Sequence, residues 1–200
     1  MIDPAAKKYA EWTAKSCQET GVRFELRETQ PYELEDKIIE ANEDDKVHGI
    51  LVYYQVFGGA QDRYLQNVVS VFKDVEGLCH TYCFNLYRNI RILEYDDKDA
   101  KRVQRKCIIP CTPLAIIKVL EAINIYNNIL PYGNRLYGRT ITIINRSEIV
   151  GRPLAALCAN DGALVYSVDI TGVQEFNRGT GLKLPHHKVT PRPDMTMEQA

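Results

Sequence analysis

The segment from Asn145 to Gly151 has residue types and spacing suited to binding a pyrophosphate. An apolar, strand-like run ends at Asn145, and a short turn leads into a helix that begins near Gly151. The first turn of a helix offers free N–H groups and the positive end of the helix dipole, which attract phosphate oxygens. Gly151 lacks a side chain, so a phosphate or another backbone segment can come close to it.

Asp169 is the candidate ligand for an adenosine ribose, because it ends the next strand-like run. A carboxylate there accepts hydrogen bonds from both ribose hydroxyls and repels a 2′-phosphate, which favours NAD over NADP. The usual G-x-G-x-x-G motif is absent, since Asn145 and Ser147 stand where glycines are normal. A plain strand–turn–helix followed by an exposed aspartate is the alternative interpretation.

Composition narrows the class of protein. The 200 residues are 45% hydrophobic and 26% charged, which is typical of a globular chain. The formal net charge of -1 provides no overall attraction to nucleic acid or to an anionic membrane. No apolar run approaches the roughly 20 residues that span a bilayer. The N-terminal segment lacks the features of a secretory or transit signal, so we expect a cytoplasmic protein.

Two cysteine pairs, Cys79/Cys83 and Cys107/Cys111, have a C-x3-C spacing, and His80 lies beside the first pair. A zinc site is conceivable, but structural zinc sites normally use C-x2-C pairs. Buried free thiols are the favoured interpretation, and no metal is expected.

Helices and strands alternate along the first 170 residues, which indicates an α/β fold. Asp3 is expected to cap the first helix and Thr112 the fourth, with Pro4 and Pro113 in their first turns. The pattern fades after Asp169, and residues 176–200 are expected to form an irregular tail. The predicted helices cover residues 3–21, 32–42, 61–70, 113–123 and 151–160, and the predicted strands cover 22–28, 47–54, 139–146 and 163–169.

Four stretches resemble the methylenetetrahydrofolate dehydrogenase/cyclohydrolase family, in the same order along the chain. NRSEIVGRPLAALCANDGA is similar to its cofactor loop, usually G-x-S-x-x-V-G-x-P, with Asn145 in place of the first glycine. The others are DPAAKKYAEWTAKS, GILVYYQVFGG with KDVEGLCH, and IIPCTPLAIIKVLE. The resemblance implies an α/β folate-binding domain at 1–110 without its first strand. A partial Rossmann-type NAD-binding domain at 111–175 and the tail at 176–200 would follow.

The departures from the family pattern concern proton chemistry. Bifunctional members carry Tyr-x-x-x-Lys on the first helix, and the lysine is tied to the cyclohydrolase step. Here the pair is Tyr9 and Thr13, and a threonine hydroxyl neither carries a charge nor titrates near neutral pH. Lys15 points away from that face of the helix. Tyr53 replaces the usual glutamine of the next strand.

With Asp169, these changes resemble the monofunctional NAD-dependent branch. The resemblance therefore implies NAD-dependent oxidation of 5,10-methylenetetrahydrofolate to 5,10-methenyltetrahydrofolate in one-carbon metabolism, without cyclohydrolase activity. It also implies a homodimer formed through the cofactor domain, with no nucleic-acid or membrane partner.

The resemblance assigns roles residue by residue. Tyr9 would stack on the folate, Tyr53 would line the same cleft, and Glu76 would bind the donor edge of the pterin. Lys73 and Asp74 would organise their loop. The catalytic candidates are Tyr9, Thr13, Tyr53 and Glu76, and the substrate-binding candidates are Tyr9, Tyr53, Glu76 and Pro113. The cofactor-binding candidates are Asn145, Arg146, Ser147, Ile149, Val150, Gly151 and Asp169.

Three alternatives stay open. A bifunctional NADP-dependent member is disfavoured by Thr13 and Asp169. Family blocks before the first helix and after Asp169 have no counterpart here, so the chain is expected to be truncated at both ends. A non-catalytic fragment that binds folate or a sister subunit would fit that expectation. A Rossmann dehydrogenase for another substrate is disfavoured by the matches in the first domain.

The ribose assignment generates a direct prediction. Asp169→Ser removes the charge that repels a 2′-phosphate, so relative affinity should shift from NAD toward NADP. Titration of the variant with both dinucleotides measures that shift, and an unchanged ratio of affinities would contradict the assignment.

Overall fold

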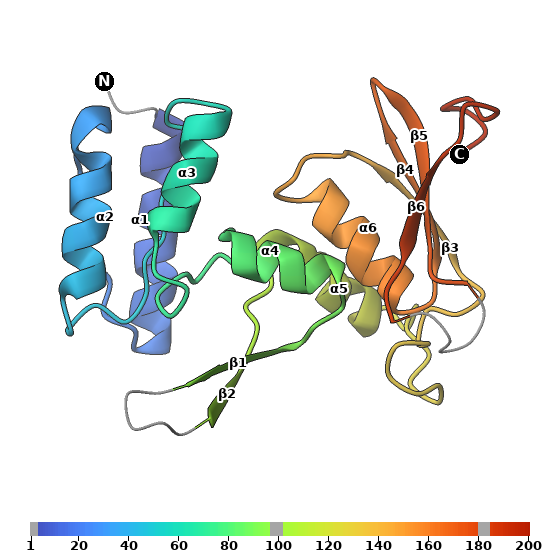
Figure 1. The fold of residues 1–200 in the computed structure, drawn as a ribbon, viewed down its shortest axis with the longest axis horizontal. Coiled ribbons are helices and arrows are strands. Elements are labelled where there is room, and N and C mark those ends of the chain that lie inside the picture. Colours follow the sequence, from blue (N-terminus) through green and yellow to red (C-terminus); the bar gives the residue numbers. More distant parts are fainter. Residues whose placement is uncertain (1–3, 97–101, 180–184) are drawn as a thin grey trace. The chain divides into compact units, whose positions relative to one another are not determined.

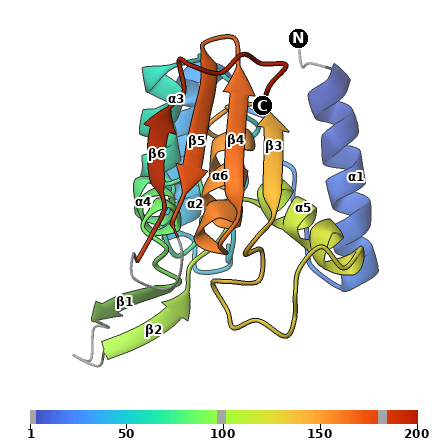
Figure 2. The ribbon, with the colours of Figure 1, turned by 90° about the vertical axis from the view of Figure 1, so that its right-hand side faces the viewer.

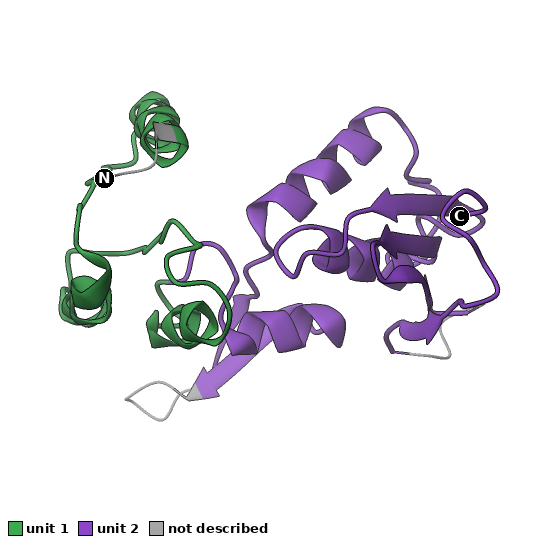
Figure 3. Ribbon diagram, turned by 90° about the horizontal axis from the view of Figure 1, so that it is seen from above, with its two compact units in different colours: residues 1–73 green, residues 74–200 purple. Residues whose placement is uncertain are grey.

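The computed structural model describes residues 4–96, 102–179 and 185–200. The chain divides into two compact units, residues 1–73 and residues 74–200 (Figure 3). None of the helices among the described residues is both long enough and apolar enough to cross a membrane.

The first unit is built from helices (Figure 1). These are α1 (Pro4–Thr20), a 3-10 turn η1 (Pro31–Glu33), α2 (Leu34–Glu43) and α3 (Ala60–Val68). The three helices predicted here are confirmed, while the expected cap Asp3 lies outside the described residues. Ile38 of α2 packs with Leu65 and Val69 in a small apolar core. Asn42 joins the helix ends, since its Nδ2 donates to the Val68 carbonyl at 2.7 Å and its Oδ1 accepts the Ser70 N–H at 2.8 Å.

The two strands predicted in this unit are wrong. Residues 22–28 form no regular element and are mostly exposed. Within 47–54 only Ile50 makes a backbone bridge, with its N–H donating to the Lys73 carbonyl at 2.7 Å. A strand needs a neighbour to satisfy its backbone groups, and the described part of this unit contains no strand. Ile50 and Val52 still pack their side chains against the helical core, which explains the apolar pattern.

The second unit contains a four-stranded sheet in the order β3-β4-β5-β6 (Figure 2). Strand β3 (Thr140–Ile144) is parallel to β4 (Leu164–Asp169), and β5 (Gly172–Asn177) and β6 (Lys188–Pro191) continue the sheet in antiparallel pairing. A separate hairpin is formed by β1 (Ile92–Asp96) and β2 (Arg102–Lys106). The helices are α4 (His80–Tyr87), α5 (Cys111–Ala122) and α6 (Gly151–Asn160).

Helix α6 lies between the sheet and the helices α4 and α5 (Figures 1 and 2). Ala155, Ala156 and Ala159 are fully buried, and their small side chains let both layers approach the helix closely. The run is rich in good helix formers and has Pro153 in its first turn. It ends before Gly162, whose φ of +97° suits a helix C-terminus.

The predicted β3–α6–β4 unit is confirmed, but three local expectations in this unit are wrong. Pro110, not Thr112, caps α5. Strand β3 is an edge strand among the described residues, so Ile144 is 82% exposed rather than buried. The predicted irregular tail contains β6, and β5 forms directly after Asp169 because Gly172, at φ +108°, permits a tight turn. Helix α4 and the β1–β2 hairpin were not predicted, since they lack a clear apolar period.

The division at residue 73/74 falls well before the expected boundary at 110. The reason is that α4 packs against α6, which joins the intervening segment to the sheet-containing unit.

A buried polar contact fixes β6 to α6. Asn160 is fully buried, and its Oδ1 accepts the His187 N–H at 2.8 Å and lies 3.0 Å from His187 Nδ1. The imidazole of His187 stacks on Phe176 with ring centroids 5.3 Å apart. Burial, with smaller contributions from His186 and Arg152, lowers the pKa of His187 to about 4. The folded state therefore keeps this imidazole neutral.

This contact predicts a pH-dependent stability. Between pH 6.5 and pH 4 the unfolded chain binds a proton on His187 that the folded chain does not, so stability rises with pH through this window. Lowering the pH from 7 to 5 should cost about 2 kcal/mol through this residue. Thermal unfolding of the unsubstituted chain and of His187→Gln measures the effect, with His48→Gln, an exposed imidazole, as the control. Equal pH slopes in the unsubstituted chain and His187→Gln would contradict the prediction.

Candidate functional site

The loop between β3 and α6 is closed by the side chain of Asn145. Its Oδ1 accepts hydrogen bonds from the Ser147 N–H at 3.0 Å, the Ser147 hydroxyl at 2.8 Å and the Gly151 N–H at 3.1 Å. The Ser147 hydroxyl in turn accepts the Val150 N–H at 3.2 Å. Asn145, which replaces a family glycine, thus holds the loop at the start of α6. The loop brings together all the predicted pyrophosphate-binding residues.

Position 151 requires a glycine because Asn145 lies very close to its Cα. A Cβ at this position would overlap the backbone carbonyl and the side-chain oxygen of Asn145. The end of β3 therefore lies directly against the first turn of α6, which is buried at this point.

Two backbone N–H groups in the loop remain available. Those of Glu148 and Ile149 donate no hydrogen bond to any described residue, whereas their neighbours Ser147 and Val150 do. Both precede the N-terminus of α6, the positive end of its dipole. Each of these N–H groups is therefore available to donate a hydrogen bond to an anion.

Asp169 ends β4, and its carboxylate contacts Arg146 of the same loop. Its Oδ1 lies 3.0 Å from Arg146 Nη1 and accepts the Thr171 N–H at 2.8 Å and the Thr171 hydroxyl at 2.6 Å. The two Thr171 donors, and then the Arg146 charge, hold the pKa of Asp169 below its ordinary value. The carboxylate is ionised at neutral pH. Thr171 was missed by the sequence reasoning, although an Asp-x-Thr-Gly turn is a recognisable signal.

In the first unit, Tyr9 of α1 and Tyr53 lie together. Their rings meet edge to face, with centroids 5.4 Å apart and planes at 86°. Tyr9 is 52% exposed, and the Tyr53 hydroxyl is buried without a hydrogen-bond partner among the described residues. The Thr13 hydroxyl donates to the Tyr9 carbonyl at 2.9 Å, and both residues line a shallow groove of about 340 Å³ on α1. The structure thus brings three predicted substrate-side residues together.

Asp74 organises its own loop, as expected, whereas the Lys73 side chain binds the end of α2 instead. The Lys73 ammonium donates to the carbonyls of Ala41, Asn42 and Asp44 at 2.7–3.0 Å, which caps the C-terminus of α2. Asp74 is 5% exposed, and its carboxylate accepts three backbone N–H groups at 2.8–2.9 Å. These N–H groups belong to Glu76, Gly77 and Cys79.

Glu76 and Pro113 belong to the second unit. Glu76 is half-buried in the loop that Asp74 organises. Pro113 is fully buried in the first turn of α5, so its packing role is evident from the structure. A contact of Pro113 with folate stays a prediction.

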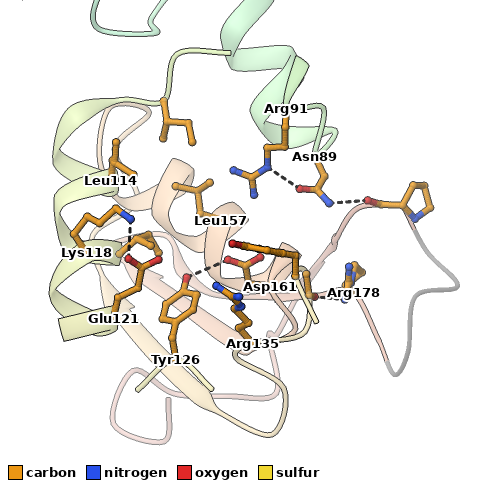
Figure 4. Close-up of a pocket in the computed structure, with 15 residues that line it drawn as sticks. Asn89, Arg91, Leu114, Lys118, Glu121, Tyr126, Arg135, Leu157, Asp161 and Arg178 are labelled. Carbon is orange, nitrogen blue, oxygen red and sulfur yellow. Dashed lines mark hydrogen bonds and ion pairs between the residues drawn. The ribbon is translucent and has the colours of Figure 1, made fainter. Parts of the chain in front are cut away.

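A cavity of about 630 Å³ lies at the C-terminal end of α6, the end opposite Gly151 (Figure 4). Tyr126 donates to Asp161 there at 3.1 Å, and Arg91, Arg135 and Arg178 surround that carboxylate. Burial raises the pKa of Asp161 despite these charges. The cavity is separate from the β3–α6 loop, and the sequence did not indicate it because α5, α6 and several loops that are distant in sequence all contribute to its lining.

The cysteine pairs do not form a metal centre among the described residues, where no group of three or more His, Cys, Asp or Glu side chains is arranged to hold an ion. Burial raises the pKa of Cys79 to about 12 and that of Cys83 to about 11, so both thiols are protonated.

The close approach at Gly151 gives a testable consequence. Gly151→Ala must push the loop away from α6, which should destabilise the chain by about 1–3 kcal/mol. The same displacement should separate the Glu148 and Ile149 N–H groups and weaken anion binding. Thermal unfolding and dinucleotide titration measure both effects, and an unchanged melting temperature would show that the loop relaxes freely.

Comparisons with known proteins identify the family of this chain. The family model for the tetrahydrofolate dehydrogenase/cyclohydrolase catalytic domain matches residues 2–76, and that for its NAD(P)-binding domain matches residues 110–178. Methylenetetrahydrofolate dehydrogenase [NAD(+)] of Schizosaccharomyces pombe is 59% identical over 187 residues, which is 94% of this chain and 57% of that protein. The protein of the same name from Dictyostelium discoideum is 54% identical over 177 residues, 88% of this chain and 55% of the relative.

The fold is similar to that of the NAD-dependent 5,10-methylenetetrahydrofolate dehydrogenase from Saccharomyces cerevisiae. The TM-score is 0.83 at 58% identity, over 96% of this chain and 59% of that chain. The chain therefore spans a little more than half the length of these relatives. The predicted α/β class and the family resemblance are confirmed, and the chain belongs to the tetrahydrofolate dehydrogenase/cyclohydrolase family.

Proposed function

We propose that this chain serves the NAD-dependent oxidation of 5,10-methylenetetrahydrofolate to 5,10-methenyltetrahydrofolate, without cyclohydrolase activity. The observation that carries the proposal is the ionised Asp169 carboxylate at the end of β4, in the same β3–α6–β4 unit as the pyrophosphate loop. The names of the similar yeast and Dictyostelium proteins support it.

The residues of the loop fit a dinucleotide. The free N–H groups of Glu148 and Ile149 suit the pyrophosphate, and Gly151 lets Asn145 lie directly against the first turn of α6. Asp169 would accept the hydroxyls of the adenosine ribose, and Arg146, Ser147 and Val150 would shape the loop around them. When bound, NAD supplies the hydride acceptor. The chain's own residues bind and orient the dinucleotide.

The folate side of the proposal uses Tyr9, Tyr53, Glu76 and Pro113. The exposed ring of Tyr9 offers a stacking face, and the buried Tyr53 hydroxyl offers a polar atom without a protein partner among the described residues. The Glu76 carboxylate suits the ring N–H and amino group of a pterin. Oxidation of the methylene bridge needs orientation rather than a protein base, because the folate nitrogens stabilise the product.

Thr13 argues against cyclohydrolase activity. Its hydroxyl donates to the carbonyl of Tyr9 one turn earlier, and it does not titrate near neutral pH. The proton transfer that hydrolysis of the product requires therefore has no general acid or base at this position.

The same proposal includes a cytoplasmic homodimer formed through the cofactor domain, with neither nucleic acid nor membrane as partner. The formal net charge of -1 supports the last point. The domain limits 1–110 and 111–175 also stand as part of the proposal.

The test mixes the chain with methylenetetrahydrofolate and either NAD or NADP and follows nicotinamide reduction. We expect turnover with NAD at least about tenfold faster than with NADP, the factor that about 1.4 kcal/mol of transition-state stabilisation provides. We expect no acceleration of methenyltetrahydrofolate hydrolysis. Preference for NADP, or accelerated hydrolysis, would point to the bifunctional class instead. Binding of both ligands without turnover would point to a non-catalytic binding chain.

A further inference from the structure

The guanidinium of Arg146 commits four of its five N–H donors to hydrogen bonds within the protein. An arginine side chain carries five N–H donors in a fixed plane. Nε donates to the Ser167 hydroxyl at 3.2 Å, and Nη2 donates to the carbonyls of Ser167 and Gly172, both at 2.6 Å. Nη1 donates to the Thr171 hydroxyl at 2.9 Å and lies 3.0 Å from Asp169 Oδ1. Four of the five donors therefore donate within β4, β5 and the turn between them, and Nη1 also forms an ion pair with the Asp169 carboxylate.

These hydrogen bonds within the protein affect whether the chain prefers NAD or NADP. A free arginine next to an adenosine ribose would grip a 2′-phosphate with two parallel N–H donors. The Arg146 side chain is instead 8% exposed and turned toward the β4–β5 turn. A phosphate gripped by two N–H donors of Arg146 would have to break a hydrogen bond that the protein already makes.

The same contacts set the orientation of Asp169. Its Oδ1 is occupied by Arg146 and by the two donors of Thr171. Its Oδ2 accepts no hydrogen bond from a described residue, and the side chain is 27% exposed. One oxygen is thus fixed by the protein while the other stays available to a ligand.

We propose that Arg146 is a positioning residue for dinucleotide selection: it fixes the β4–β5 turn so that Asp169 presents Oδ2 to a ribose, and its four committed donors and its ion pair with Asp169 withhold it from a 2′-phosphate. The inference rests on the proposed function, because it assumes that the ribose lies at Asp169. It differs from a direct ligand role for Arg146, which the loop motif alone would suggest.

Two consequences separate positioning from a merely structural role. First, the effect of Asp169 on NAD/NADP preference should depend on Arg146, because Asp169→Ser removes the ion-pair partner of Nη1 and leaves its charge to a 2′-phosphate. Second, the pKa of Asp169 should respond to Arg146, since that is the one charged side chain among the described residues that bears on this carboxylate.

The experiment titrates the chain with NAD and with NADP by calorimetry, using Arg146→Gln, Arg146→Lys, Asp169→Ser and the double variant Arg146→Gln/Asp169→Ser. Arg139→Gln is the matched control, because it removes the same charge at an exposed position preceding the other end of β3. Carboxyl NMR follows the titration of Asp169 in the unsubstituted chain and in each Arg146 variant.

We expect Arg146→Gln to weaken NAD binding by about tenfold or more, as loss of hydrogen bonds to a charged group does, with no gain for NADP. Arg146→Lys keeps the charge and should recover part of the loss. Asp169→Ser should favour NADP by about tenfold when Arg146 is present and by less than about twofold in the double variant. The pKa of Asp169 should rise in Arg146→Gln and stay unchanged in Arg139→Gln.

NAD affinity within about twofold of the unsubstituted chain in a folded Arg146→Gln variant would overturn the proposal. So would an equal shift toward NADP with and without Arg146. If Arg146→Gln does not fold, Arg146→Lys and its NMR titration decide, and an unchanged Asp169 pKa with unchanged NAD affinity there overturns the proposal. A chain that binds neither dinucleotide contradicts the proposed function, whereas the NMR titration still tests the coupling of Arg146 to Asp169.

Discussion

The burial of α6 between the sheet and two helices is the constraint on which the site depends. The alanines of α6 let the sheet approach closely enough that the end of β3 touches the first turn of the helix. At that contact Gly151 has no room for a side chain. The loop from Asn145 to Val150 must therefore fold back on itself, and Asn145 provides the three hydrogen bonds that close it.

Three charged side chains form hydrogen bonds with the backbone and so hold it in place, instead of binding a ligand. Lys73 caps α2, Asp74 gathers the N–H groups of its loop, and Arg146 fixes the β4–β5 turn. Each of them makes most of its hydrogen bonds within the protein. These bonds fix the backbone next to Glu76 and Asp169. The charged residues of a motif are therefore not all ligands, and counting their hydrogen bonds separates the two kinds.

The sequence predicted best where local and tertiary signals agree. The β3–α6–β4 unit has strong apolar runs, a helix-compatible turn and a carboxylate at the end of β4, and it forms as expected. The strand predicted at 22–28 rested on alternation and the strand predicted at 47–54 on a near-continuous apolar run, and both failed because neither pattern supplies a pairing partner. The run at 47–54 buries Ile50 and Val52 against helices instead. Residues after Asp169 were misjudged because a short antiparallel strand such as β6 is defined by its register with β5, which no local pattern encodes. The hydrogen bonds of Arg146 likewise depend on the carbonyls of Ser167 in β4 and Gly172 in β5, which the motif does not reveal.

The most direct measurement is a crystal structure of this chain with NAD bound. The account predicts the pyrophosphate at the N–H groups of Glu148 and Ile149, and a ribose hydroxyl within hydrogen-bond distance of Asp169 Oδ2, with Arg146 still bonded to the β4–β5 turn. A dinucleotide bound instead in the cavity at the C-terminal end of α6, or an Arg146 turned outward onto its phosphates, would contradict it.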